Sequence, residues 1–146
     1  MIAAERAAGI APDPLRRLAA LIPADPALAE QIAARLKLSN KARKRLSCAA
    51  SANIDEAPQA LAYRVGVDCA ADRLLLAGRC DEAAAIEKWD VPRLPIAGGV
   101  LIARGLARGP VVAETLRRIE RRWVEDGFPG GSELEEIVSE EVAAAI

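Results

Sequence analysis

The fold class is decided by the stretch Asp25-Pro-Ala-Leu-Ala-Glu-Gln-Ile-Ala-Ala-Arg-Leu-Lys-Leu-Ser-Asn40. Asp25 can accept hydrogen bonds from the first backbone N–H groups of a helix, and Pro26 lacks the N–H that would be unpaired there. The apolar residues that follow recur with the 3.6-residue helical period: Leu28, Ala29, Ile32, Ala33 and Leu36. Ser39 or Asn40 can then cap a second helix. This stretch predicts two consecutive helices joined by a short turn.

The same signals from proline, glycine and capping residues occur along the whole chain. Strands are not predicted, because β-branched residues never alternate with polar ones over a useful length. Hydrophobic residues make up 52% of the chain but aromatic residues only 3%, so small and aliphatic side chains must fill the core. We therefore predict an all-α fold, an irregular bundle of about eight or nine short helices. The expected helices cover residues 14–22, 26–36, 40–49, 58–65, 68–77, 81–89, 100–104, 110–125 and 132 onward.

Two further helices have specific expected caps. Asp68 is expected to cap the helix that ends near Gly78, and Ser132 with Glu135 forms the pattern of a capping box for the last helix. The segment Val91-Pro-Arg-Leu-Pro95 cannot be helical, because proline restricts its own backbone and that of the preceding residue. We therefore predict a helical body over residues 1–91 and a smaller C-terminal helical lobe over 92–146.

Charge is segregated along the chain although the formal net charge is only −1. Six basic residues and no acid lie between Gln31 and Asn53, and six arginines with two acids lie between Leu101 and Arg122. The segment from Glu125 to Ile146 holds seven acids and no base. Such segregation produces local fields that the net charge conceals.

The glycine-rich stretch from Pro95 to Pro110 predicts a short helix, a tight turn and the start of a longer helix. Backbone N–H groups at such a start attract an anion, and Gly109 allows close approach because it has no Cβ. Guanidinium groups before and along the helix could grip a sugar–phosphate backbone without reading bases. The plain alternative is a helix–turn–helix connection with solvated arginines. The candidate RNA-binding residues here are Arg104, Arg108, Gly109, Pro110, Arg117, Arg118 and Arg121.

A second candidate contact lies in the first basic run, at Lys41, Arg43 and Lys44. The alternative is a solvated helix face. The aromatic residues are single and widely spaced, so they are expected in the core, and recognition of RNA shape and phosphates fits better than stacking on bases.

No catalytic residues are predicted. The chain has no histidine and no phosphate-binding glycine motif, and the only close acidic pair in the body worth testing is Asp68 and Asp72, one helical turn apart. Pairing of Asp72 with an arginine is the favoured interpretation.

The three cysteines form no CxxC motif, so no metal site is expected. We expect the cysteines to be small, reduced core residues in a cytoplasmic protein. No apolar stretch approaches the ~20 residues that span a bilayer, and no secretory signal is visible, so no membrane contact is expected.

Several collinear segments resemble the C-terminal helical region of bacterial CCA-adding tRNA nucleotidyltransferases and class II poly(A) polymerases. Between about residues 15 and 130 they occur in the family's order: Leu15 to Pro23, Ala33 to Asn40, Tyr63-Arg-Val-Gly66, Asp72 to Leu76, Pro95 to Gly98, Leu101 to Gly105, Gly109-Pro110, Trp123 and Phe128-Pro129. One departure is Val100, where the family's pattern has an acid. If that acid caps the short helix, Gly98 or Gly99 must take its place.

The resemblance implies a helical body and tail that bind tRNA, while catalysis belongs to N-terminal domains this chain lacks. Mg²⁺ and CTP or ATP would bind only in that catalytic head, so this chain alone is expected to be inactive and to hold no cofactor. The expected partners are tRNA and the catalytic domain, in cis or as a separate chain. The alternative function is a helical protein-interaction module that docks on a separate catalytic subunit.

Overall fold

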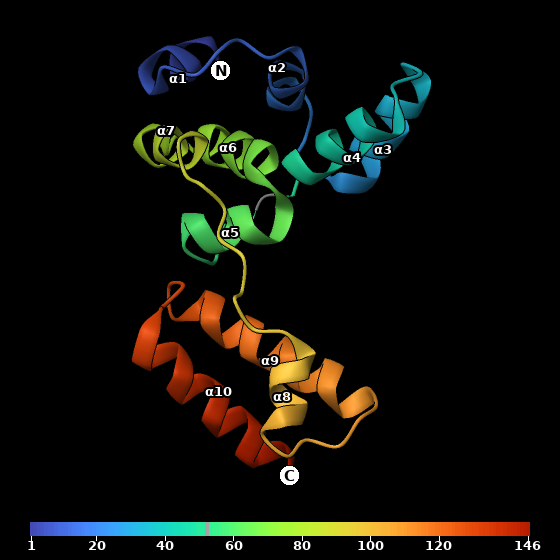
Figure 1. Ribbon diagram of the computed structural model, residues 1–146. Coiled ribbons are helices and arrows are strands. Elements are labelled where there is room, and N and C mark those ends of the chain that lie inside the picture. Colours follow the sequence, from blue (N-terminus) through green and yellow to red (C-terminus); the bar gives the residue numbers. More distant parts are fainter. Residues whose placement is uncertain (52) are drawn as a thin grey trace. The chain divides into compact units, whose positions relative to one another are not determined.

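The computed structural model describes residues 1–51 and 53–146, and within them it is all-helical, which confirms the expected fold class (Figure 1). The described residues form ten helices rather than eight or nine; the one the sequence missed is the first. Their bounds are α1 Ile2–Ala8, α2 Pro14–Leu21, α3 Pro26–Arg35, α4 Asn40–Ala49, α5 Pro58–Val65, α6 Val67–Leu76, α7 Cys80–Glu87, α8 Gly98–Ala103, α9 Pro110–Glu125 and α10 Gly131–Ala145.

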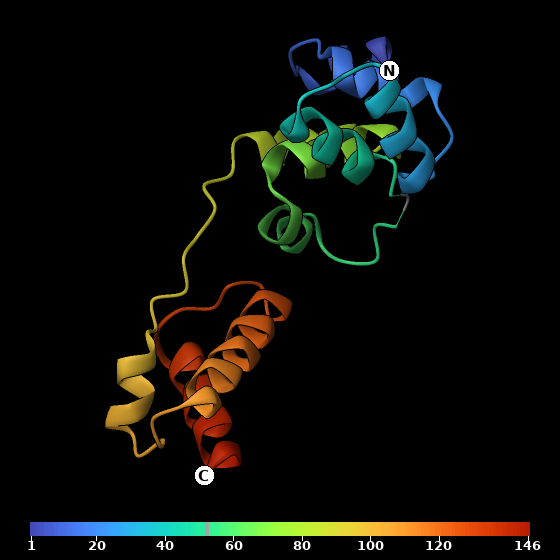
Figure 2. The ribbon, with the colours of Figure 1, turned by 90° about the vertical axis from the view of Figure 1, so that its right-hand side faces the viewer.

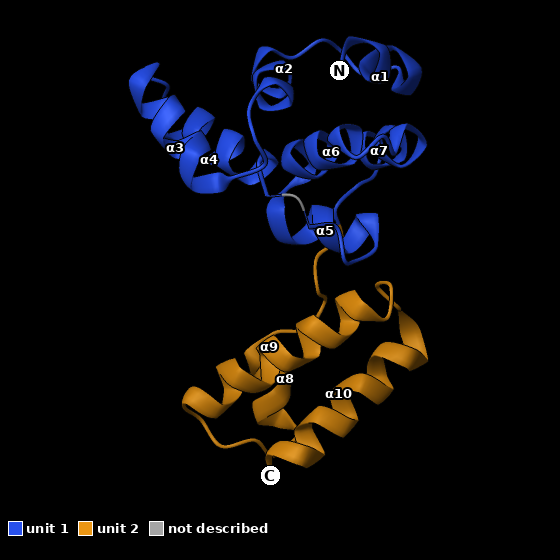
Figure 3. Cartoon of the chain, turned by 180° about the vertical axis from the view of Figure 1, so that it is seen from behind, with its two compact units in different colours: residues 1–91 blue, residues 92–146 orange. Residues whose placement is uncertain are grey.

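The chain divides into two compact units, Met1–Val91 and Pro92–Ile146 (Figure 3). Residues 91–97 between α7 and α8 are not helical. This segment contains Pro92 and Pro95, whose rings fix φ and remove the backbone donor that a helix needs. Unit 1 contains α1 to α7, and unit 2 contains α8 to α10.

Three helices of unit 1 begin at side-chain caps, and those at Asp25 and Ser39 are among the predicted ones. Asp13 accepts from the N–H groups of Leu15 and Arg16, and Asp25 accepts from those of Ala27 and Leu28 in the same way. Ser39 Oγ accepts from the N–H of Ala42 at 3.2 Å. Each cap is worth about 1 kcal/mol relative to alanine.

The two caps expected at Asp68 and Ser132 are not formed. α6 begins at Val67, so Asp68 already lies within its first turn, and the N-cap residue is Gly66. α10 begins at Gly131, which places Ser132 inside the helix. The start of α8 also differs from expectation, because its N-cap residue is Ala97 rather than a glycine.

Unit 1 is built around two apolar clusters, one joining α2, α3 and α4 and one joining α1, α5, α6 and α7. Leu46 is fully buried among alanines in the first cluster, where small side chains let the helices approach closely. Leu61, Leu74 and Ile86 are fully buried in the second cluster. Each buried Leu or Ile contributes about 1.5–3 kcal/mol by leaving water.

A network of ion pairs with a buried centre, formed by Glu5, Arg16 and Asp72, connects α1, α2, α4 and α6 of unit 1. It contains three carboxylates and three guanidinium groups: Glu5, Asp13, Asp72, Arg16, Arg17 and Arg45. The pairing expected for Asp72 is confirmed, because it accepts hydrogen bonds from both Arg16 and Arg45. Balanced pairing is what makes burial of these charges tolerable.

The cysteines differ from the expectation of three reduced thiols. Cys48 in α4 and Cys69 in α6 form a disulfide with a Cα–Cα distance of 6.2 Å, and Cys80 is free. The two cysteines are 21 residues apart and belong to no recognised motif, so the disulfide could not be predicted from the sequence.

Unit 2 is a pair of long helices, α9 and α10, that lie side by side in both views (Figures 1 and 2). The short helix α8 packs on α9 so closely that a Cβ on Gly98 would lie 2.9 Å from Val112 Cγ1. Trp123 closes the loop between α9 and α10, since its indole N–H donates to the Pro129 carbonyl at 2.8 Å. The buried core residues are Leu101, Leu106, Thr115, Ile119, Trp123, Leu134, Ile137, Val138 and Val142.

Candidate nucleic-acid interface

The start of α9 is open to solvent. Gly109 and Pro110 are both exposed, and nothing lies within 4 Å of the position a Cβ on Gly109 would take. Gly109 adopts φ 135°, a conformation that favours glycine. Pro110 carries no N–H, and the N–H of Val112 already donates to the Gly109 carbonyl at 3.1 Å. The turn therefore offers fewer free donors than the sequence predicted, and side chains must supply most of the positive charge.

The acidic helix α10 neutralises three arginines of unit 2. Arg104 pairs with Glu135 at 2.6 Å, Arg118 pairs with Glu141 at 2.9 Å, and Arg122 pairs with Glu140 and Glu141. Arg104 and Arg118 belong to the contact set that the sequence predicted. Because their guanidinium groups already pair with carboxylates of α10, these two arginines are removed from the predicted set of RNA contacts.

Four other arginines of unit 2 form no ion pair with the described residues of that unit: Arg93, in the segment before α8, and three that lie before or along α9. Arg108, Arg117 and Arg121 are exposed, and no carboxylate among the described residues of unit 2 lies within 4.0 Å of their guanidinium nitrogens. Arg117 and Arg121 are one helical turn apart and so share a face of α9. Glu114 is exposed three residues before Arg117, on the same face. We call Arg108, Gly109, Pro110, Arg117 and Arg121 the α9 surface; its side chains carry three positive charges.

The second candidate contact lies in unit 1, and one of its three basic side chains is paired with a carboxylate. Lys41 and Lys44 are exposed on α4, and neither forms an ion pair with the part of the chain that the structure describes. Arg43 pairs with Glu30 at 3.1 Å, so this predicted contact is engaged on the surface. We call Lys41 and Lys44 the α4 surface.

A hollow of about 410 Å³ lies beside the α4 surface. Its walls come from α4 and from the start of α6, and the Cys48–Cys69 disulfide joins them. The lining residues are Lys41, Lys44, Arg45, Cys48, Val65, Gly66, Val67, Asp68 and Cys69. Arg45 lines the hollow but is committed to Asp72, which together with Asp13 holds the pKa of Arg45 above its ordinary value. Lys41 and Lys44 are therefore the cations that this hollow offers to a ligand.

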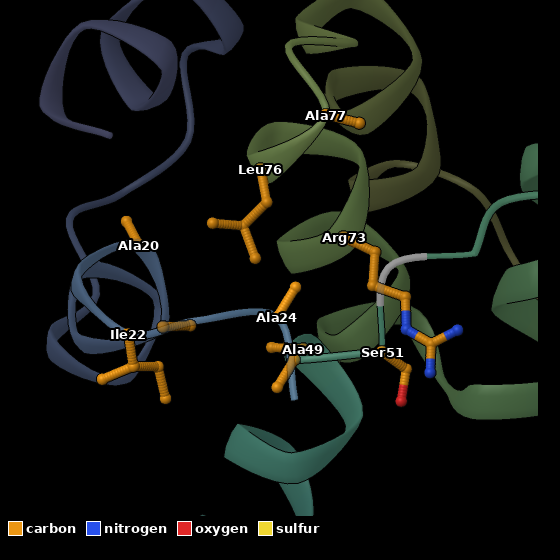
Figure 4. A pocket seen from close by; sticks show the side chains of 10 residues that line it. Ala20, Ile22, Ala24, Ala49, Ser51, Arg73, Leu76 and Ala77 are labelled. Carbon is orange, nitrogen blue, oxygen red and sulfur yellow. The ribbon is translucent and has the colours of Figure 1, made fainter. Parts of the chain in front are cut away.

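A smaller hollow of about 240 Å³ lies between the ends of α2, α4 and α6 (Figure 4). Its walls are mostly methyl groups, with Leu76 and Ala49 among them, and Ser51 and Arg73 lie at one end. Arg73 is buried and donates from Nε to the Cys48 carbonyl at 2.7 Å. Burial lowers the pKa of Arg73. The lining contains no pair of groups suited to acid–base chemistry.

Within the described residues, no three His, Cys, Asp or Glu side chains gather in a way that could hold a metal ion. Asp72 is enclosed by arginines, and Asp68 stands exposed beside it in α6. No described helix combines the length and apolar character needed to cross a bilayer.

Comparison of the chain with protein-family models, with curated proteins and with solved structures found no match. The likeness to the tRNA nucleotidyltransferases therefore rests on the collinear sequence segments alone.

Proposed function

We propose that this chain binds the sugar–phosphate backbone of tRNA and positions the tRNA for nucleotide addition at its 3′ end. The single observation that carries the proposal is the α9 surface. Arg108 precedes the open, glycine-bounded start of the helix, Arg117 and Arg121 lie on one face farther along it, and none of the three has a carboxylate partner among the described residues of unit 2. Unneutralised guanidinium groups on a rigid helix are suited to phosphate oxygens. The collinear family resemblance narrows the RNA to tRNA.

The proposed binding mode recognises shape and phosphates rather than bases. Trp123 is buried in the unit 2 core and contacts Phe128 edge-to-face, with ring centroids 5.0 Å apart. These rings are therefore committed to packing rather than to stacking on bases. The α4 surface adds two more cations in unit 1, so a folded RNA could neutralise up to five charges on the chain.

Catalysis belongs, in this proposal, to a separate head domain, joined in cis or as another chain. Mg²⁺ and CTP or ATP would bind there. Whether the reaction is CCA addition or polyadenylation is a property of that head.

A salt titration tests the proposal. Labelled tRNA is titrated with the full chain between about 50 and 300 mM salt, and the binding constant is plotted against salt concentration on logarithmic axes. Each phosphate contact contributes about 0.7–0.9 to the magnitude of the slope, so five engaged cations would give a slope of about −3.5 to −4.5, and fewer contacts a smaller one. We expect a slope between about −2 and −4. Binding that is absent near ~50 mM salt, or unchanged by salt, would contradict the proposal.

Two companion measurements separate the rival functions. Light scattering that reveals self-association or docking, together with no tRNA affinity, would favour a protein-interaction module. Incubation of the chain with tRNA, CTP, ATP and magnesium should leave the tRNA length unchanged. Any addition of nucleotides would show that the chain catalyses the reaction itself.

A further inference from the structure

The Cys48–Cys69 disulfide lies in the wall of the 410 Å³ hollow beside the α4 surface. On α4, Lys41, Lys44 and Cys48 follow at helical spacing, so the two lysines and the cysteine share the face that lines the hollow. Cys69 lies in the first turn of α6, the opposite wall. The disulfide is thus the covalent link between the wall that carries the cations and the wall that faces them.

The surroundings of both sulfurs stabilise thiolates. Nη2 of Arg73 lies 3.5 Å from Sγ of Cys48, and a nearby guanidinium favours the ionised thiol. Cys69 is the third residue of a ten-residue helix whose N-cap, Gly66, supplies no side-chain hydrogen bond. A helix N-terminus likewise favours a thiolate. A disulfide whose reduced form is stabilised in this way is reduced more readily than an ordinary structural one.

We infer that Cys48 and Cys69 form a reversible redox site whose substrate is a dithiol reductant, and that its state controls the RNA contact at the α4 surface. The second half of this inference rests on the proposed function; the first half does not. The hollow gives a reductant access, because both cysteines line it and Cys48 is only half-buried.

The exchange balances as an ordinary two-electron reduction. A thiolate of the reductant attacks Sγ of Cys48 and forms a mixed disulfide, and Cys69 leaves as a thiolate at the start of α6. The second thiolate of the reductant then attacks its own bonded sulfur and releases Cys48 as a thiolate beside Arg73. The reductant ends as a disulfide, and the chain gains two electrons and, at full protonation, two protons.

Reduction should loosen the hollow without unfolding the unit. Arg45 still ties α4 to α6 through Asp72, with Nε 2.8 Å from Oδ2, and Arg73 still donates to the Cys48 carbonyl. The covalent link at the hollow itself is lost, so Lys41 and Lys44 are no longer held at a fixed distance from the start of α6. Less preorganised cations bind a phosphate backbone more weakly.

Counting thiols tests the redox site. The air-oxidised full chain should take up one alkylating group, at Cys80, and the chain held in a buffer of reduced and oxidised dithiothreitol, a dithiol couple, should take up three. Three labels in the oxidised chain, or one in the reducing buffer, would overturn the inference. Arg73→Gln should require a more reducing buffer for half-reduction than Arg73→Lys, which retains a positive charge. If the two variants are half-reduced in the same buffer, the charge of Arg73 does not stabilise the Cys48 thiolate.

RNA affinity tests the coupling. In a Cys80→Ser background, tRNA binding is compared between the oxidised chain, the reduced chain and a Cys48→Ser/Cys69→Ser variant, with helicity checked by circular dichroism. We expect the reduced chain and the serine variant to bind roughly three- to tenfold more weakly than the oxidised chain, through lost preorganisation. Equal affinity in both redox states would overturn the coupling while leaving the proposed function intact. Absence of binding in every state would instead contradict the proposed function, and the thiol count would still decide the redox site.

Discussion

Arg16 in α2 donates from Nε to Oδ1 of Asp72 in α6 at 2.8 Å, and the two side chains are only 3% and 1% exposed. Arg45 in α4 donates to the same carboxylate through two nitrogens, at 2.8 and 2.9 Å. One carboxylate thus joins three helices that are distant in sequence. A buried charge in such a position is costly to leave without its partners.

Replacing Asp72 by asparagine should destabilise unit 1 strongly. The substitution keeps the size of the side chain but removes the charge that compensates two guanidinium groups. Breaking a buried ion pair costs about 3–5 kcal/mol. Urea denaturation followed by circular dichroism measures the free energy of unfolding. Asp68→Asn, on the exposed face of the same helix, is the control and should change stability by less than about 0.5 kcal/mol. Similar losses for the two variants would contradict the structural role of the network.

Stability should fall in acid because two carboxylates of the network have lowered pKa values. Burial alone would raise the pKa of Glu5, but the Asp13 N–H and the guanidinium groups of Arg17 and Arg16 outweigh it and hold the pKa below 4.5. Burial would also raise the pKa of Asp13. Hydrogen bonds from the Arg16 N–H and the Arg45 side chain outweigh burial and hold this pKa below 3.8. Groups with a lowered folded-state pKa stabilise the fold above their unfolded-state pKa and lose that contribution as the pH falls.

The free energy of unfolding should therefore hold between about pH 7 and 5 and decline below about pH 4.5, where the unfolded chain binds more protons. Urea denaturation at a series of pH values measures it. Asp13→Asn keeps a helix cap but removes one titrating group, so this variant should lose less stability between pH 6 and pH 3 than the unaltered chain. A chain that is as stable at pH 3 as at pH 7 would contradict this account.

Gly109→Ala should destabilise unit 2 through the backbone alone. No atom lies within 4 Å of the added Cβ, but the φ of 135° is unfavourable for any residue with a side chain. Such a conformation costs about 1–3 kcal/mol. Fluorescence of Trp123 in a Trp89→Phe background reports thermal unfolding of this unit. Gly99→Ala, inside α8 with open space around it, is the control and should be neutral or slightly stabilising. If Gly109→Ala melts no lower than the control, the start of α9 does not need this backbone conformation.

Local signals in the sequence were sufficient for most helices. Asp25-Pro26, Ser39 and Pro110 each mark a helix start that depends only on neighbouring residues, and the structure begins helices there. Helix α1 carries no such signal. Its buried residue Glu5 is held by Arg16 and Arg17, which follow it by 11 and 12 residues, so its placement depends on tertiary contacts.

The candidate site was harder to predict because charge alone does not reveal pairing. Arg117 and Arg118 are adjacent arginines, yet among the described residues of unit 2 only Arg118 of the two pairs with a carboxylate, that of Glu141 in α10. The acidic run after the arginines was the available signal, because an acidic helix that folds back on a basic one must neutralise part of it. Which arginines it reaches depends on the packing of α10 against α9, and the sequence does not specify that packing.

The most direct test of the central claim compares two pairs of arginines on α9. Arg117→Gln/Arg121→Gln removes two unpaired charges, whereas Arg118→Gln/Arg122→Gln removes two charges already neutralised by α10. Both variants change the net charge equally, so long-range effects on tRNA cancel in the comparison. In the salt titration of tRNA binding, the first variant should reduce the magnitude of the slope by about 1–2, and the second by less than about 0.5. An equal or larger loss in the second variant, or no loss in either, would contradict the claim that the α9 surface binds the RNA backbone.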